Sequence, residues 1–230
     1  MNRLPDAHAP LTSGRPAQRS RGWAFVLGVV VTAVVSAAGA AAFFVQQQPP
    51  ASDSAEAGFA RDMQVHHAQA VEMSLLVRDK TDDPEVRALA YDIATSQQQQ
   101  MGQMAAWLQL WDLPATSEQP QMSWMEGADA ETSGQQMQMP TGGRMPGLAS
   151  PEQLDQLRQA KQAQAEALFL ELMIEHHKAG AAMARSAYVL TDEPVVRSLS
   201  SAIVTSQMAE VQVMEDLLDS RRAATADRKP

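Results

Sequence analysis

An internal repeat limits the fold of this chain more strongly than any other feature of its sequence. The segment Met63-Gln-Val-His66-His67 returns as Met173-Ile-Glu-His176-His177, at a constant offset of 110 positions. An offset kept across residues 59–104 and 169–214 without an insertion indicates that one structural unit has been duplicated. The same offset also relates Phe59 to Phe169, Met73 to Met183, Pro84 to Pro194, Arg87 to Arg197, Gln97 to Gln207 and Met104 to Met214.

Each copy has the pattern of a helical hairpin. In the first copy, apolar or histidine positions recur at alternating steps of four and three, which predicts one buried helix face. Asp53 is predicted to cap this helix, and Thr81-Asp-Asp83 is predicted to end it. Pro84 then suits the first turn of a second helix that ends near Trp111. The inward positions of the first helix are Phe59, Met63, His66, Ala70, Met73 and Val77.

Two hairpins that each carry one apolar seam cannot bury those seams separately. The sequence therefore predicts an all-α four-helix bundle over residues 53–220, made of repeats 53–111 and 151–220. The third helix is expected from Pro151 to Leu190, with a possible break before Ala165. Residues 112–150 form a long connection, which leaves open whether the hairpins pack parallel or antiparallel.

The N-terminal residues predict a membrane anchor. Residues 1–21 carry four arginines against one acid, and residues 22–45 carry no charge and are long enough to cross a bilayer. Basic residues before the apolar run place the N-terminus in the cytoplasm. We therefore expect a single-pass anchor in the cell membrane, a linker at 46–52, an extracytoplasmic bundle and a charged tail at 221–230. A cleaved signal peptide is the alternative, and it would make the protein secreted.

Composition excludes several classes of function. The chain has no cysteine, which rules out disulfides, zinc–thiolate sites and thiol catalysis. A net charge of −9 argues against nucleic acid as a partner. Methionine is unusually common, with 14 residues in 230, and the two His-His pairs hold four of the five histidines. Any soft-metal chemistry must therefore use thioethers and imidazoles.

The repeated segment groups ligands that suit copper. Met63 lies three and four positions before His66 and His67, so the thioether and both imidazoles share one helical turn. Thioether with imidazole favours Cu(I) over Cu(II), while zinc does not explain the methionines. Iron is also less suitable, because a di-iron bundle needs inward glutamates. The predicted ligands are Met63, His66, His67, Met173, His176 and His177, with weaker indications for Met73, Met104, Met183, Met214, Glu210, Met137, Met139 and Met145.

The simpler interpretations remain open at this stage. Inward histidines are often hydrogen-bonded core residues, and seam methionines are often flexible core filler. The connection at 112–150 is either a flexible arm that collects copper through its thioethers or a disordered tract of accidental composition. Its methionines are Met122, Met125, Met137, Met139 and Met145.

These motifs together resemble the domain of unknown function 305 family. Each Met-x-x-His-His segment is followed by a Met, by Asp/Glu-Pro-x-Val-Arg-x-Leu and by Ser-Gln, over residues 56–219. The resemblance implies a ferritin-like four-helix bundle and a relation to CopM-type copper-binding proteins. The chain departs from the family pattern at Gln100, where an acid such as Glu210 is usual, and at Leu148, where the family often has Met.

The sequence therefore favours an extracytoplasmic copper-binding protein that buffers copper, confers tolerance or passes copper to trafficking proteins. No acid–base or nucleophile constellation indicates an enzyme. Two other hypotheses stand beside it: a ferritin-like metal-dependent oxidoreductase, and a structural or partner-binding bundle whose histidines are core residues.

Overall fold

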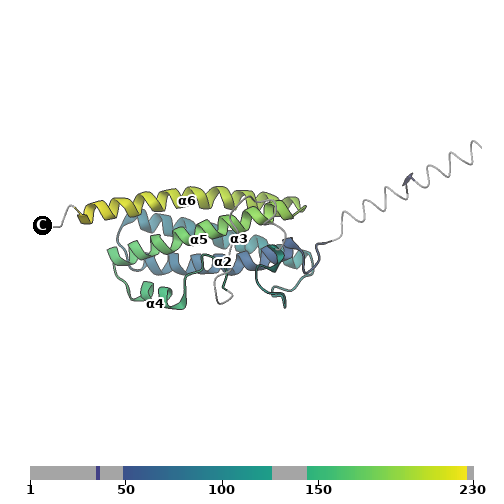
Figure 1. Cartoon of the computed structure of the whole chain (residues 1–230), viewed down its shortest axis with the longest axis horizontal. Coiled ribbons are helices and arrows are strands. Elements are labelled where there is room, and N and C mark those ends of the chain that lie inside the picture. The colour runs from purple at the N-terminus through teal and green to yellow at the C-terminus, as the bar shows by residue number, and fades with distance from the viewer. Residues whose placement is uncertain (1–34, 37–48, 126–143, 227–230) are drawn as a thin grey trace, which may run out of the picture. The chain divides into compact units, whose positions relative to one another are not determined.

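The computed structural model describes residues 35–36, 49–125 and 144–226, and the side chains of these residues up to 222 (Figure 1). The chain divides into two units, Met1–Pro49 and Pro50–Pro230, and the fold below is that of the second unit. The predicted anchor at 22–45 lies outside the described residues except for positions 35 and 36, as do Met137 and Met139. Within the described residues, no helix is both long and apolar enough to cross a membrane.

The described part of the second unit is all-α. The long helices are α2 (Ala55–Arg78), α3 (Pro84–Leu110), α5 (Ala163–Leu190) and α6 (Pro194–Ala226). A 3-10 turn, η1 (Ser123–Met125), lies in the connection between the hairpins, and a short helix, α4 (Pro151–Gln159), precedes α5. No strand occurs among residues 49–125 and 144–226. The prediction of an all-helical bundle is confirmed.

The helix ends follow local capping rules, with one correction. Ser54, not Asp53, caps α2, because its side chain accepts the Ala57 N–H at 3.3 Å. Asp83 caps α3 ahead of its proline, and Ser150 forms a capping box with Gln153 at the start of α4.

Two boundaries at the second hairpin have clear tertiary causes. The predicted third helix is broken after α4, where Gln162 has a φ of 46° and its N–H donates to the Lys80 carbonyl at 3.0 Å. Helix α6 continues to Ala226, past the boundary expected at 220. Arg221, at the start of this extension, holds α6 to the bundle, because its guanidinium bonds Asp83 just before α3 and Glu166 near the start of α5.

The two hairpins pack antiparallel about a pseudo-twofold axis. Helix α2 packs on α3, α5 packs on α6, and α2 contacts α5. Glu56 at the start of α2 accepts a hydrogen bond from Thr191 at the end of α5, at 2.7 Å. Glu166 at the start of α5 accepts one from Thr81, just after α2. These two bonds join equivalent positions of the repeats, so they settle the packing direction that the sequence left open.

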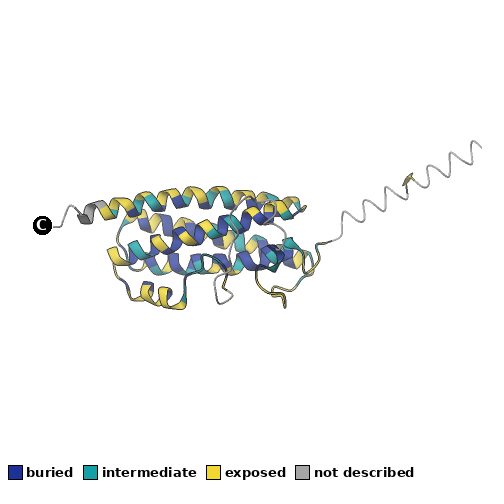
Figure 2. Cartoon of the chain, viewed as in Figure 1, coloured by how far each residue is buried: buried dark blue, intermediate teal, exposed yellow. Residues whose placement is uncertain are grey.

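The apolar core consists of two clusters that contain both predicted seams. Figure 2 shows that buried residues follow α2 and α5, while α4 is largely exposed. The first cluster, which we call the six-methionine cluster, includes Met63, Met104, Met122, Met125, Met145 and Met183. The second, the three-methionine cluster, includes Met73, Met173 and Met214 beside Leu154 and Leu157 of α4.

The connecting segment is not a free arm at its described ends. Met122, Met125 and Met145 are all buried, with exposures of 7%, 8% and 1%. Apolar side chains of a connecting segment are buried when the segment folds back on a hydrophobic end of the bundle. The prediction of a flexible arm is therefore wrong for these three methionines. It stays a prediction for Met137 and Met139, which lie outside the described residues.

Candidate metal centre

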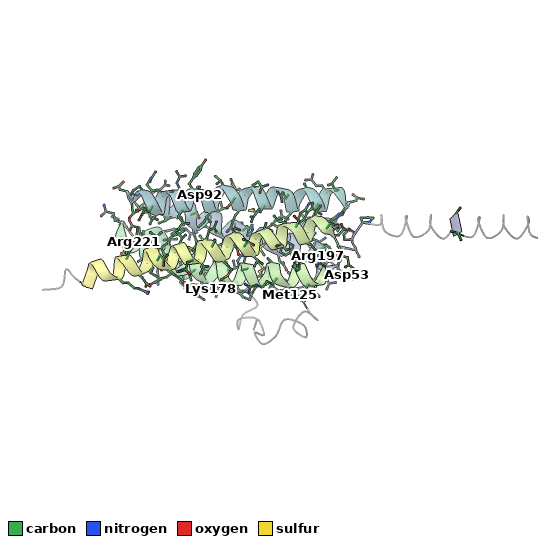
Figure 3. The ribbon with its side chains drawn as sticks, turned by 90° about the horizontal axis from the view of Figure 1, so that it is seen from above. Asp53, Asp92, Met125, Lys178, Arg197 and Arg221 are labelled. Carbon is green, nitrogen blue, oxygen red and sulfur yellow. The ribbon has the colours of Figure 1, made fainter. Side chains whose placement is uncertain are left out.

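Four histidines form a fully buried polar layer near the middle of α2 and α5. His66, His67, His176 and His177 all have 0% exposure. The rings of His66 and His176 face each other, with centroids 3.8 Å apart and planes inclined by 37°. Antiparallel packing brings these equivalent residues together, because the pseudo-twofold axis passes between them. Lys178 follows His177 but lies at the outer edge of the helices, where it pairs with Glu215 (Figure 3).

The inner pair of imidazoles is fixed by backbone carbonyls. His66 Nε2 lies 3.3 Å from the Pro146 carbonyl oxygen, and His176 Nε2 lies 2.9 Å from the His66 carbonyl oxygen. A carbonyl oxygen can only accept, so each Nε2 must carry the proton and donate it. In the neutral ring this leaves Nδ1 with an unprotonated lone pair.

The outer pair is fixed by side chains on the neighbouring helices. His67 Nε2 lies 2.7 Å from Gln100 Oε1 on α3, and His177 Nε2 lies 2.6 Å from Glu210 Oε2 on α6. Both acceptors are oxygens, so Nε2 again donates. A side chain that orients a histidine through its second nitrogen is usual where the first nitrogen binds a metal.

All four Nδ1 atoms are buried without a hydrogen-bond partner. The side-chain amides of Gln97 and Gln207 are buried and unpartnered at both polar atoms. Gln207 lies beside the inner pair, because a Cβ placed on Gly180 would be 2.5 Å from Gln207 Oε1 and 3.1 Å from His66 Cε1. Buried polar atoms of native proteins nearly always have a partner, so this concentration of free ones marks a candidate ligand site.

Burial keeps the imidazoles of His66, His67 and His176 neutral and able to bind a metal. It lowers the pKa of His66 and of His67 to about 3, and it lowers the pKa of His176 well below its ordinary value. The proximity of the other histidine rings acts in the same direction for His66 and His176. A metal binds the deprotonated nitrogen, so no proton must leave these three rings at neutral pH.

Thioethers lie on both sides of the imidazole layer. Met63 and Met173 precede the two His pairs by one turn, and both are fully buried. Met104 and Met214 lie one turn beyond Gln100 and Glu210, on the same helix faces. All of the predicted helix methionines have 0% exposure: Met63, Met73, Met104, Met173, Met183 and Met214.

The structure also limits the kind of site that these residues can form. Among the described residues, no group of three or more His, Asp and Glu side chains has the arrangement to hold a metal ion. Glu210 in particular is engaged with His177 rather than free. Any metal at this centre would therefore need thioether or other ligands beside the imidazoles.

Two structural supports of the site were missed by sequence reasoning. Gly147 has a φ of +77°, and a Cβ there would lie 2.5 Å from the Ala179 Cβ, so glycine lets the segment lie against α5. This places the Pro146 carbonyl on His66. Asp62 Oδ2 accepts the Met122 N–H at 2.7 Å and the Trp124 Nε1–H at 2.9 Å, which holds η1 on the bundle.

The family model described as "Domain of unknown function (DUF305)" matches residues 56–218. The chain belongs to this family. Two DUF305 crystal structures are similar to it. The protein from Streptomyces coelicolor is 46% identical, with 74% of this chain and 96% of that chain covered and a TM-score of 0.66. The fragment from Deinococcus radiodurans is 32% identical, with coverage of 72% and 96% and a TM-score of 0.57.

CopM shares this fold at lower identity. Its Cu(II)-bound form is 23% identical over 73% of this chain and 97% of that chain, with a TM-score of 0.54. Its Cu(I)-bound form is 24% identical over 73% and 96%, also with a TM-score of 0.54. Silver-bound forms of CopM are similar as well. No functionally curated protein matches the chain.

Proposed function

We propose that this DUF305 protein binds copper, with Cu(I) favoured over Cu(II), and that it buffers copper or passes it on. The observation that carries the proposal is the set of four buried Nδ1 lone pairs, each left free because Nε2 is held by an oxygen acceptor. Neutral imidazole nitrogen beside thioether sulfur is the ligand set that Cu(I) prefers.

The proposed ligands follow from this geometry. The proposed nitrogen ligands are the Nδ1 atoms of His66, His67, His176 and His177, and the proposed sulfur ligands are the thioethers of Met63 and Met173. No three of these imidazoles are arranged to hold one ion, so each bound copper takes a mixed set of imidazole and thioether ligands. Gln100 and Glu210 orient the outer imidazoles. Further thioethers allow copper to move along the seams, from Met73, Met104, Met145, Met183 and Met214. The CopM forms with Cu(I), Cu(II) and silver support this choice of metal through the shared fold.

The proposed location is outside the cytoplasm. The support comes from the order of the N-terminal residues, in which arginines precede an uncharged run at 22–45. The Streptomyces coelicolor relative also carries a provisional name as a secreted protein. A bundle on that side of the membrane would meet incoming copper and could hand it to trafficking proteins.

The test is a Cu(I) titration of the full-length protein against a competing chelator. We compare the wild type with Met63→Leu/Met173→Leu, because leucine keeps the volume of the core and removes the sulfur. A second variant changes all four paired histidines to alanine. We expect the leucine pair to weaken Cu(I) binding by at least about tenfold and the histidine variant to abolish tight binding.

Met208→Leu serves as the matched control, because Met208 is 40% exposed on the outer face of α6. Its affinity for Cu(I) should equal that of the wild type. Wild-type binding no tighter than that of the histidine variant would overturn the proposal. In that case the histidines are core residues of a structural bundle.

A further inference from the structure

The two halves of the candidate centre differ in charge at one repeated position. The histidines His67 and His177 are equivalent, and each is bonded through Nε2 to a residue 33 positions later. That residue is a neutral amide, Gln100, in the first repeat and a carboxylate, Glu210, in the second. The two bonds have nearly the same length, 2.7 Å and 2.6 Å, so geometry is conserved between the halves while charge is not.

A carboxylate partner changes what the facing nitrogen prefers to bind. The carboxylate accepts the Nε2–H in a charge-assisted hydrogen bond, which increases the electron density that the ring offers at Nδ1. It also places a negative charge one ring away from the bound ion. His177 is fully buried and the Glu210 side chain is only 22% exposed, so solvent screens this charge incompletely. Attraction to the carboxylate is larger for a divalent ion than for a monovalent ion.

The two halves of the centre also differ in the number of thioethers near them. Met63, beside His67, belongs to the six-methionine cluster. Met173, beside His177, belongs to the three-methionine cluster, where leucines of α4 take part in the packing. This difference arises from the segments that cover the two ends of the bundle. The η1 turn and the segment around Met145 cover one end, and α4 covers the other. Soft thioethers are therefore concentrated in the half that lacks the carboxylate.

We infer that the two halves are specialised for different oxidation states of copper. The half formed by His67, Gln100 and Met63 takes Cu(I). The half formed by His177, Glu210 and Met173 takes Cu(II). This inference rests on the proposed copper-binding function and assigns an ion to each half of that centre.

The test exchanges charge at the two equivalent positions. Glu210→Gln keeps an oxygen acceptor for His177 and removes the charge, while Gln100→Glu adds a charge beside His67. Cu(II) and Cu(I) affinities of the full-length protein are measured separately by chelator competition, and Cu(II) is also followed by electron paramagnetic resonance. We expect Glu210→Gln to weaken Cu(II) binding about tenfold and to change Cu(I) binding by less than about threefold.

Two further readings are expected from the same variants. The reduction potential of the bound copper should rise in Glu210→Gln by about 59 mV for each tenfold loss of Cu(II) affinity relative to Cu(I). Gln100→Glu should strengthen Cu(II) binding at the first half and give two equivalents of tightly bound Cu(II). A thermal unfolding curve unchanged in Glu210→Gln shows that the bundle is intact.

The outcomes separate this inference from the proposed function. Equal loss of Cu(I) and Cu(II) affinity in Glu210→Gln would overturn the assignment of the two halves while leaving copper binding in place. No change in either affinity would overturn it as well. A wild-type protein that binds neither ion would overturn the proposed function, and this inference with it.

Discussion

Acidification of the metal-free protein should destabilise the bundle as the pH falls below 6.5, because buried imidazoles resist protonation in the folded state. The pKa of His66 and of His67 is about 3 in the folded protein, against 6.5 for a free histidine. Between these values the unfolded chain binds protons that the folded chain does not. Stability is therefore complete above pH 6.5 and is lost as the pH falls from 6.5 toward 3.

The size of this loss of unfolding free energy follows from the difference in proton binding between the folded and unfolded chains. Each histidine contributes about 1.4 kcal/mol for each pH unit in that window. At pH 5 this amounts to about 2 kcal/mol for each of His66 and His67, or about 4 kcal/mol together. His176 acts in the same direction, because burial lowers its pKa too. A domain has only about 5–15 kcal/mol of stability, so the loss is a large share of it.

The assay is urea unfolding followed by circular dichroism at pH 7.5, 6 and 5, in the presence of a chelator. Asp62 opposes the trend, since burial raises the pKa of its carboxyl and favours the folded state as the pH falls. Comparison with His67→Gln removes this background, because the variant lacks one titrating ring. We expect the slope of unfolding free energy against pH to be smaller in His67→Gln by about 1.4 kcal/mol per unit. Equal slopes in the two proteins would refute the description of His67 as a buried neutral imidazole.

Two substitutions test the supports around the centre, and a third, at an exposed glycine, provides a contrast. Gly147→Ala should lower the free energy of unfolding by about 1–3 kcal/mol, because its Cβ meets Ala179 and its φ is positive; an unchanged thermal midpoint would contradict the fit of this segment against α5. Gly102→Ala, where a Cβ meets no atom within 4 Å, should instead raise stability by about 0.5–1 kcal/mol through helix propensity. Asp62→Asn should cost about 1–3 kcal/mol in urea unfolding and shift the fluorescence of Trp124, since the amide cannot replace both accepted bonds equally well. Fluorescence identical to that of the wild type would show that Asp62 does not hold η1.

The parts of the fold that could be predicted are those whose residues occur in both repeats. Helix seams depend on local periodicity, and the repeat compares each seam position with its copy. Met63 and Met173 were therefore placed in the core, and His66 and His176 on the inward face, from spacing alone. The repeat also places Gln97 and Gln207 at equivalent seam positions. That their side-chain amides are buried without partners is visible only in the structure.

The parts that were not predictable lie where the two repeats differ. Asp62 has Leu172 as its counterpart, and Pro146 lies in the connection between repeats, so neither had a second copy to mark it. The burial of Met122 and Met145 depends on how the connection folds back, which local composition does not determine. The antiparallel packing depends on contacts between distant ends, such as that of Glu56 with Thr191.

The most direct test of the central claim is to observe which imidazole nitrogen binds the metal. Long-range ¹H–¹⁵N correlation of ¹⁵N-histidine-labelled protein distinguishes Nδ1 from Nε2, and Cu(I) is diamagnetic, so the signals persist after it is added. The metal-free protein should show Nε2–H tautomers for His66, His67, His176 and His177. On addition of Cu(I), we expect the Nδ1 signals of these rings to shift while their Nε2–H signals remain. Shifts at Nε2, or no shift at either nitrogen, would contradict the account.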